Sequence, residues 1–228
     1  MRTPCTLDEA TARKILPGIQ SVQDQRIEAV SEGLRQIDPG MGRLRALRAL
    51  HEFHSKLMGP RMFLYAMDKR RYSFLAGTLH KGEIHFTIWH AKATSRGPVC
   101  LNENVCYAHM GEHATARLFQ RLRTTDADQA WAELRPAAGL LYALAVGKIE
   151  IPEGEVARVP TRTGHLVVPE FSSEGPTIVT FNTDVKTGDE RLAHIRRCRE
   201  EQTVYFCPDR SPRSQGGTTG GTELAVSV

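Results

Sequence analysis

Cysteine and histidine are concentrated in one short stretch of the chain, GPVCLNENVCYAHMGEH, which spans residues 97–113. It contains Cys100, Cys106, His109 and His113. A thiol beside an imidazole can act as a nucleophile, because the imidazole takes up the thiol proton. Thiolates and imidazoles are also ligands that zinc prefers. The stretch is therefore compatible with a catalytic thiol, a metal site, or a strand that buries these residues.

Cys106 is the first candidate nucleophile, because the residues that follow it, HATARLFQRLR, are predicted to form a helix, and a helix amino terminus favours a thiolate. Further along, His165 opens an apolar predicted strand, HLVV. A second predicted strand, TIVTFN, would return beside it and bring Asn182 or Asp184 close to the ring. Such a polar group fixes the tautomer and orientation of an imidazole. We therefore predict a site formed by Cys106, His165 and either Asn182 or Asp184.

This order of residues, a cysteine at a helix start and later Gly-His, two strands and Asn or Asp, resembles the papain-like cysteine hydrolases. That group includes bacterial effector proteases, glutamine deamidases and viral leader proteases. The resemblance implies attack of the Cys106 thiolate on a protein amide, through an acyl-enzyme. It covers residues 106–184, and two family features are missing. FNTDV stands where the family usually has Asp-Pro, and no glutamine precedes Cys106 at the position typical of the oxyanion hole.

Cys100 is a second candidate thiol. With His109 as its base, it resembles more distantly the sandwich-type toxin deamidases, in which the cysteine and the histidine lie on neighbouring strands.

A structural zinc site is the competing chemistry for the same stretch. Cys100, Cys106, His109 and His113 follow the pattern C-x5-C-x2-H-x3-H, whereas the established zinc patterns begin with cysteines two to four residues apart. Elsewhere, His85 and His90 lie five residues apart in a predicted strand, so they point to opposite faces and cannot share one metal.

The elements that must position these residues change in type along the chain. Residues 1–58 are predicted to be a helical segment, because apolar residues recur there every three or four positions. Its first helix is expected to start at Thr6, in the capping-box sequence TLDE, and to end at Pro17–Gly18.

Residues 59–207 are predicted to form the main domain. RMFLYAM, RYSFLAGTL and EIHFTIWH indicate a β-meander in which HKGE makes a turn. After the Cys/His stretch come helical patterns in DADQAWAEL and PAAGLLYALAV, then short strands beginning with KIEI, a late helix in GDERLAHIRRCREE and a last strand in TVYFC. This order predicts an α+β fold with a largely antiparallel sheet. Residues 208–228, rich in Gly, Ser and Thr, are expected to be a disordered tail.

Composition excludes several classes of protein. The chain has 228 residues, a net charge of +4 and no apolar run long enough to span a membrane. The amino terminus lacks the apolar core of a secretory signal, so we expect a cytoplasmic protein, or one exported without a cleavable signal. Basic residues are interleaved with acidic ones, so no specific nucleic-acid partner is predicted. The five cysteines are an odd number, which favours reduced thiols over disulfides.

Taken together, the sequence predicts a thiol-dependent hydrolase of the cysteine protease or glutamine deamidase type, with a protein as substrate and no cofactor. Two alternatives stay open. One is a non-enzymatic interaction domain in which the cysteines belong to the core, and the other is a small zinc-stabilised protein.

Overall fold

Two β-sheets and five helices make up the part of the chain that the computed structural model describes, which is residues 7–34, 42–59, 62–67, 71–94, 97–169, 171–172, 175–183, 189–208 and 225–226. Helices come first, and strands and helices then follow in blocks. Both sheets consist mostly of antiparallel pairs, with one parallel pair between β4 and β8. The predicted α+β fold is confirmed.

The helices are α1 (Glu9–Leu34), α2 (Arg43–Met58), α3 (Glu112–Leu122), α4 (Ala127–Ala145) and α5 (Asp189–Glu200). The six-stranded sheet has the order β1 (Met62–Met67), β2 (Arg71–His80), β3 (Glu83–Thr94), β4 (Gly97–Met110), β8 (Gly175–Ile178) and β7 (Phe171–Ser172). The five-stranded sheet has the order β11 (Ala225–Val226), β10 (Val204–Pro208), β5 (Glu155–Pro160), β6 (Gly164–Val168) and β9 (Thr180–Thr183).

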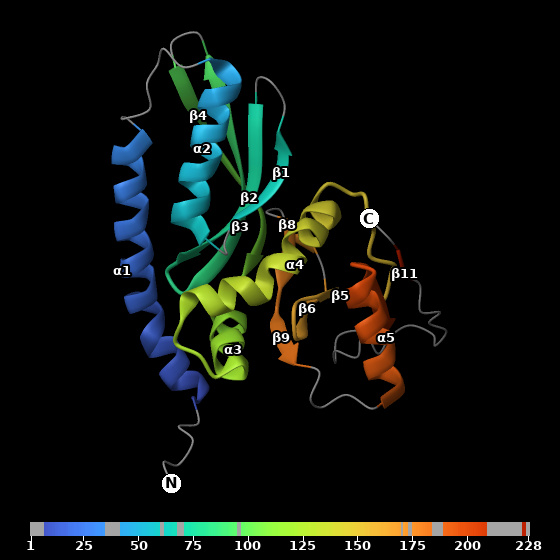
Figure 1. Cartoon of the computed structure of the whole chain (residues 1–228). Coiled ribbons are helices and arrows are strands. Elements are labelled where there is room, and N and C mark those ends of the chain that lie inside the picture. Colours follow the sequence, from blue (N-terminus) through green and yellow to red (C-terminus); the bar gives the residue numbers. More distant parts are fainter. Residues whose placement is uncertain are drawn as a thin grey trace.

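The helices cover different faces of these sheets. Figure 1 shows α1 and α2 along the six-stranded sheet, α4 between the two sheets, and α5 against the five-stranded sheet. Leu47 and Leu50 of α2 pack onto Tyr72 and Phe74 of β2. The predicted helical segment thus contributes directly to covering the sheet.

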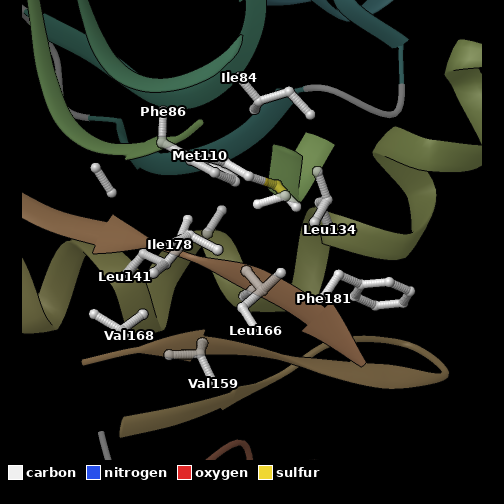
Figure 2. Packing of buried hydrophobic residues seen from close by; sticks show 14 of the residues in the cluster. Ile84, Phe86, Met110, Leu134, Leu141, Val159, Leu166, Val168, Ile178 and Phe181 are labelled. Carbon is white, nitrogen blue, oxygen red and sulfur yellow. The ribbon is translucent and has the colours of Figure 1, made fainter. Parts of the chain in front are cut away.

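The main core fills the space between the two sheets. Figure 2 shows Phe86 and Met110 of the larger sheet approaching Leu166 and Val168 of the smaller one, with Leu141 of α4 among them. Each of these five side chains is at most 2% exposed. Burying one such side chain contributes about 1.5–3 kcal/mol, so this layer fixes how the sheets lie relative to each other.

The first helix is longer than the sequence predicts. The structure continues α1 through Pro17 and Gly18, where the prediction placed its end. A proline inside a helix removes one backbone hydrogen bond, but Ala12 and Leu16 are buried and Gln23 is anchored on β2, so packing holds the helix together on both sides of the proline. Thr6 lies outside the described residues. Near the start of the helix, Asp8 accepts a hydrogen bond from the backbone N–H of Thr11.

Two further predictions of elements need correction. The patterns at 126–134 and 136–146 form the single helix α4, which runs through Pro136. KIEI, predicted as a strand, contains no strand, and β5 begins only at Glu155. Of the predicted tail, Pro208 ends β10 and Ala225–Val226 pair with that strand. Residues 209–224 and 227–228 lie outside the described residues.

A buried glutamate connects α4 to the turn between β5 and β6. Glu133 is 3% exposed. Its carboxylate accepts hydrogen bonds from the Thr161 hydroxyl at 2.6 Å and from the Thr163 backbone N–H at 2.7 Å and hydroxyl at 2.9 Å. A buried carboxylate is tolerated when its oxygens are satisfied in this way. The contact is therefore structural, and it positions the start of β6.

We expect Glu133→Gln to lower the free energy of unfolding by about 1–2 kcal/mol, because the amide group cannot accept hydrogen bonds with both of its heavy atoms. Urea denaturation measures the change. Glu150→Gln, at an exposed position, serves as the control and should change it by less than about 0.5 kcal/mol. Equal stability of the two variants would contradict the structural role of Glu133.

Candidate functional site

Cys106 lies inside strand β4, in a β-bulge. Thr87 of β3 pairs with Cys106, and its neighbour Phe86 pairs with Ala108, so Tyr107 is an extra residue. Tyr107 and Ala108 both belong to the main core. In a regular strand Cys106 would share the core face with Ala108, but the bulge turns it to the other face of the sheet, where it is half-buried.

On that face the thiol meets a histidine from the neighbouring strand. Cys106 Sγ lies 3.7 Å from Nδ1 of His85, and its thiol also donates to the Ala108 carbonyl, at 3.4 Å. The other ring nitrogen, Nε2, lies 3.7 Å from Oε2 of Glu83. The side chain of His85 is 26% exposed and that of Glu83 is 44% exposed. Thiol, imidazole and carboxylate therefore form a row that solvent can reach.

The β2–β3 hairpin sets the position of the histidine and the glutamate. Lys81 and Gly82 both have positive φ, 49° and 84°, as a two-residue hairpin turn of type I′ requires. This turn pairs His80 with Glu83. Since side chains alternate along a strand, Glu83 and His85 point to the same face. The turn predicted at HKGE is therefore the element that places the glutamate and the histidine.

More polar side chains share this face of the sheet. His109 of β4 pairs with His85, and Thr177 of β8 pairs with His109. Nδ1 of His109 is buried and has no hydrogen-bond partner among the described residues. The ring of His80 lies 6.2 Å from that of His85, edge to face. Because Cys106 pairs with Thr87 and His109 pairs with His85, these imidazoles lie between the thiol and the β2–β3 turn.

Tyr107 supports the bulge from the core side. Its hydroxyl donates a hydrogen bond to the Ala138 carbonyl of α4, at 3.2 Å. Burial raises the pKa of Tyr107, with smaller contributions from Cys106 and Tyr142. The phenol therefore stays protonated and remains a donor, which helps to keep Cys106 turned away from the core.

The predicted pairing of Cys106 with His165 needs correction. His165 lies in β6 of the five-stranded sheet. Its neighbours Leu166 and Val168 point into the main core, whereas Val167, on the same face as His165, packs with Cys207 on the outer side. Cys106 and His165 thus lie on different sheets, each facing away from the core that separates the sheets.

His165 has other partners. Its Nε2 lies 3.2 Å from Nη1 of Arg158, and its ring contacts Tyr205 edge to face at 6.0 Å. The predicted strand TIVTFN is divided between β8 and β9, which belong to different sheets, and Asn182 of β9 is the cross-strand neighbour of His165. Asp184 lies outside the described residues. The structure thus places His165 and Asn182 together, at a distance from Cys106.

The zinc pattern is not assembled either. His113 lies in the first turn of α3, and its Nδ1 contacts Oε1 of Glu9 at 2.8 Å. His109 belongs to β4 instead, on the face of Cys106. The side chain of Cys100 is outside what the structure describes. Among the described residues, no group of three or more histidine, cysteine or acidic side chains is arranged to hold a metal ion.

Two residues of the site, His85 and Glu83, were not predicted as partners of a thiol. Their spacing in EIH places them on one strand face, and this was the available signal. From the sequence, His85 is predicted only to be unable to share a metal with His90. The pairing of His85 with Thr78 and of His90 with Ser73 confirms that these two histidines face opposite ways.

Comparison of the chain with models of protein families, with curated proteins and with solved structures finds no match. No helix among the described ranges is both long and apolar enough to cross a membrane.

Proposed function

We propose that the protein is a thiol-dependent hydrolase that cleaves an amide of a protein substrate, with Cys106 as the nucleophile and His85 as the general base. The proposal rests on two contacts of the His85 ring. Its Nδ1 lies 3.7 Å from Sγ of Cys106, and its Nε2 lies 3.7 Å from Oε2 of Glu83. Both distances lie within the looser range of catalytic contacts in proteins without bound substrate.

In the first half of the reaction, Nδ1 of His85 accepts the thiol proton and Sγ attacks the amide carbonyl. The imidazolium then donates that proton to the leaving nitrogen. The C–N bond breaks, an amine leaves, and a thioester on Cys106 remains. Glu83 faces Nε2, so it favours the tautomer with a proton on Nε2 and stabilises the imidazolium.

In the second half, His85 accepts a proton from water, and the resulting hydroxide attacks the thioester. The C–S bond breaks and the thiol regains its proton, so one amide and one water give one acid and one amine. His109 lies across from His85 on the same face. An N–H of its ring is the donor that we assign to the developing oxyanion.

A chromogenic ester tests the proposal without knowledge of the substrate. The protein is mixed with p-nitrophenyl acetate, quenched in acid and digested, and the acetylated peptides are identified by mass spectrometry. We expect a thioester on Cys106 that forms faster than acetylation of free cysteine, because His85 removes the thiol proton. Cys198 and Cys207 are buried and should stay unmodified.

Acetylation that is confined to lysines, or that is no faster at Cys106 than on free cysteine, would contradict the proposal. Protein alkylated beforehand at Cys106 is the control for background hydrolysis.

Glu83→Gln is expected to lower kcat for this ester by about tenfold and to leave KM unchanged. The effect is smaller than the roughly 10⁴-fold loss for a buried triad carboxylate, because Glu83 is 44% exposed and solvent screens its charge. Steady-state kinetics measure both constants. Glu83→Asp should recover part of kcat, and Glu112→Gln, at another half-exposed glutamate, should match the wild type. A rise in KM alone would show that Glu83 does not act through His85.

A further inference from the structure

A pocket of about 460 Å³ lies between α1 and the start of α4. One wall consists of α1 residues that include Ile15, Gly18, Ile19 and Val22. The other wall consists of residues 125–128 and Trp131. Its volume lies in the range of small-molecule sites in proteins. The residues proposed for hydrolysis do not line it.

The aromatic wall of the pocket is preformed. A Cβ atom at residue 77 would collide with the ring of Trp131, so the glycine in β2 leaves the space that this ring occupies. Trp131 is only 5% exposed. On the α1 side, Gln23 exchanges two hydrogen bonds of 3.0 Å with the backbone of Leu79. Both walls are therefore attached to the same strand, and the pocket does not depend on a ligand for its shape.

The charges on the two walls differ. Asp126 and Asp128 lie on the α4 wall, and Lys14 lies on the α1 wall. Lys14 already has an acidic neighbour, Asp8. Hydrogen bonds from Thr11, and to a smaller extent the charge of Lys14, lower the pKa of Asp8. Asp126 accepts a hydrogen bond from the Asp128 backbone N–H at 2.9 Å, so the amino terminus of α4 already has an anion of its own. An anionic ligand is therefore disfavoured on the α4 wall.

We propose that this pocket binds a small organic ammonium ion with an apolar body. The apolar part would contact Ile15, Ile19 and Val22. The ammonium group would lie at the α4 wall, where a carboxylate attracts a cation. The proposal is independent of the thiol chemistry, because the pocket and the Cys106 face use different residues.

Three probes of nearly equal size test the ligand class by isothermal titration calorimetry on the full chain. They are 2-phenylethylammonium, 2-phenylethanol and phenylacetate. We expect the ammonium to bind at least fivefold more tightly than the alcohol, and the carboxylate to bind most weakly. Tighter binding of phenylacetate, equal binding of all three probes, or no binding of any would overturn the proposal.

Two variants locate the binding. A Cβ atom at Gly18 would meet no atom within 4 Å, so Gly18→Phe can fill the pocket and should abolish binding of the ammonium. Gly18→Ala is the matched control, and it should bind as the wild type does. Asp126→Asn keeps the capping acceptor of α4 and removes one charge, so it should weaken the ammonium about fivefold and leave the alcohol unchanged. Unchanged ammonium binding in Gly18→Phe would place the ligand elsewhere and overturn the assignment.

Discussion

Cys106→Ser should lower ester turnover by about a thousandfold or more, and His85→Gln by about a hundredfold or more. The serine hydroxyl is a far weaker nucleophile than a thiolate, and a general base typically contributes 10²–10⁴-fold. Both side chains are partly exposed, so neither change creates a large cavity. Steady-state kinetics with p-nitrophenyl acetate measure the loss.

Variants of one cysteine and one histidine in the five-stranded sheet serve as controls for this prediction. Cys207→Ser and His165→Gln should keep at least half of the wild-type rate, because both residues lie in the other sheet. Thermal melting of Cys106→Ser should stay within a few degrees of the wild type, which separates loss of chemistry from loss of fold. A Cys106→Ser protein with normal turnover would contradict the proposed function.

Acid should destabilise the protein through one buried histidine, His54 of α2. It is 3% exposed, and its ring lies 4.8 Å from that of Phe74 and 5.9 Å from that of Tyr72. Nδ1 has no hydrogen-bond partner among the described residues. Burial, with a smaller contribution from the nearby His51, lowers the pKa of His54 from 6.5 to about 4.

The direction of the effect follows from proton binding. Between pH 6.5 and about 4, the unfolded chain binds a proton at His54 and the folded chain does not. The stabilisation is therefore complete above pH 6.5 and is lost as the pH falls toward 4. A shift of this size corresponds to about 3 kcal/mol of unfolding free energy.

His54→Leu removes this titration. Urea denaturation at pH 7.5 and at pH 4.5 should show a large acid-induced loss of stability in the wild type, and a loss smaller by about 2–3 kcal/mol in the variant. His51→Gln, on the same helix, is the control and should keep most of the wild-type dependence. A parallel pH dependence in wild type and His54→Leu would show that the folded protein accommodates a charged His54.

Local patterns were sufficient to predict much of the fold. The meander, the turn at HKGE and the opposite orientation of His85 and His90 all follow from short-range rules of alternation and turn chemistry. The helical stripes in the first 58 residues likewise predict that this segment is helical, although not that α1 continues through Pro17. Each of these features depends only on residues that lie close together in the sequence.

Features that depend on packing between distant segments were not predictable in this way. Pro17 and Pro136 stand inside helices, where local rules place an end, because buried contacts on both sides hold each helix together. KIEI has the composition of a strand, but only Ile149 is fully buried, and none of the described strands pairs with it.

Dependence on contacts between distant segments also explains why the sequence pairs Cys106 with His165 and not with His85. Simple alternation places Cys106 on the face of Ala108, which is the core face, and only the bulge at Tyr107 turns it toward His85. A bulge has no reliable signal in a single sequence, so local patterns point to the more distant His165 as the partner of Cys106. The type and neighbours of Cys106 identify it as a candidate in the sequence, whereas its partner His85 is set by the register between β3 and β4.

The rate at which iodoacetamide alkylates Cys106 at neutral pH tests the central contact most directly. Peptide mapping over time gives this rate for the wild type, His85→Gln and His165→Gln. If the imidazole of His85 takes up the thiol proton, His85→Gln should label at least tenfold more slowly, and His165→Gln at the wild-type rate. Labelling of Cys106 that is equally fast without His85, or that slows when His165 is replaced instead, would contradict the assignment of the base.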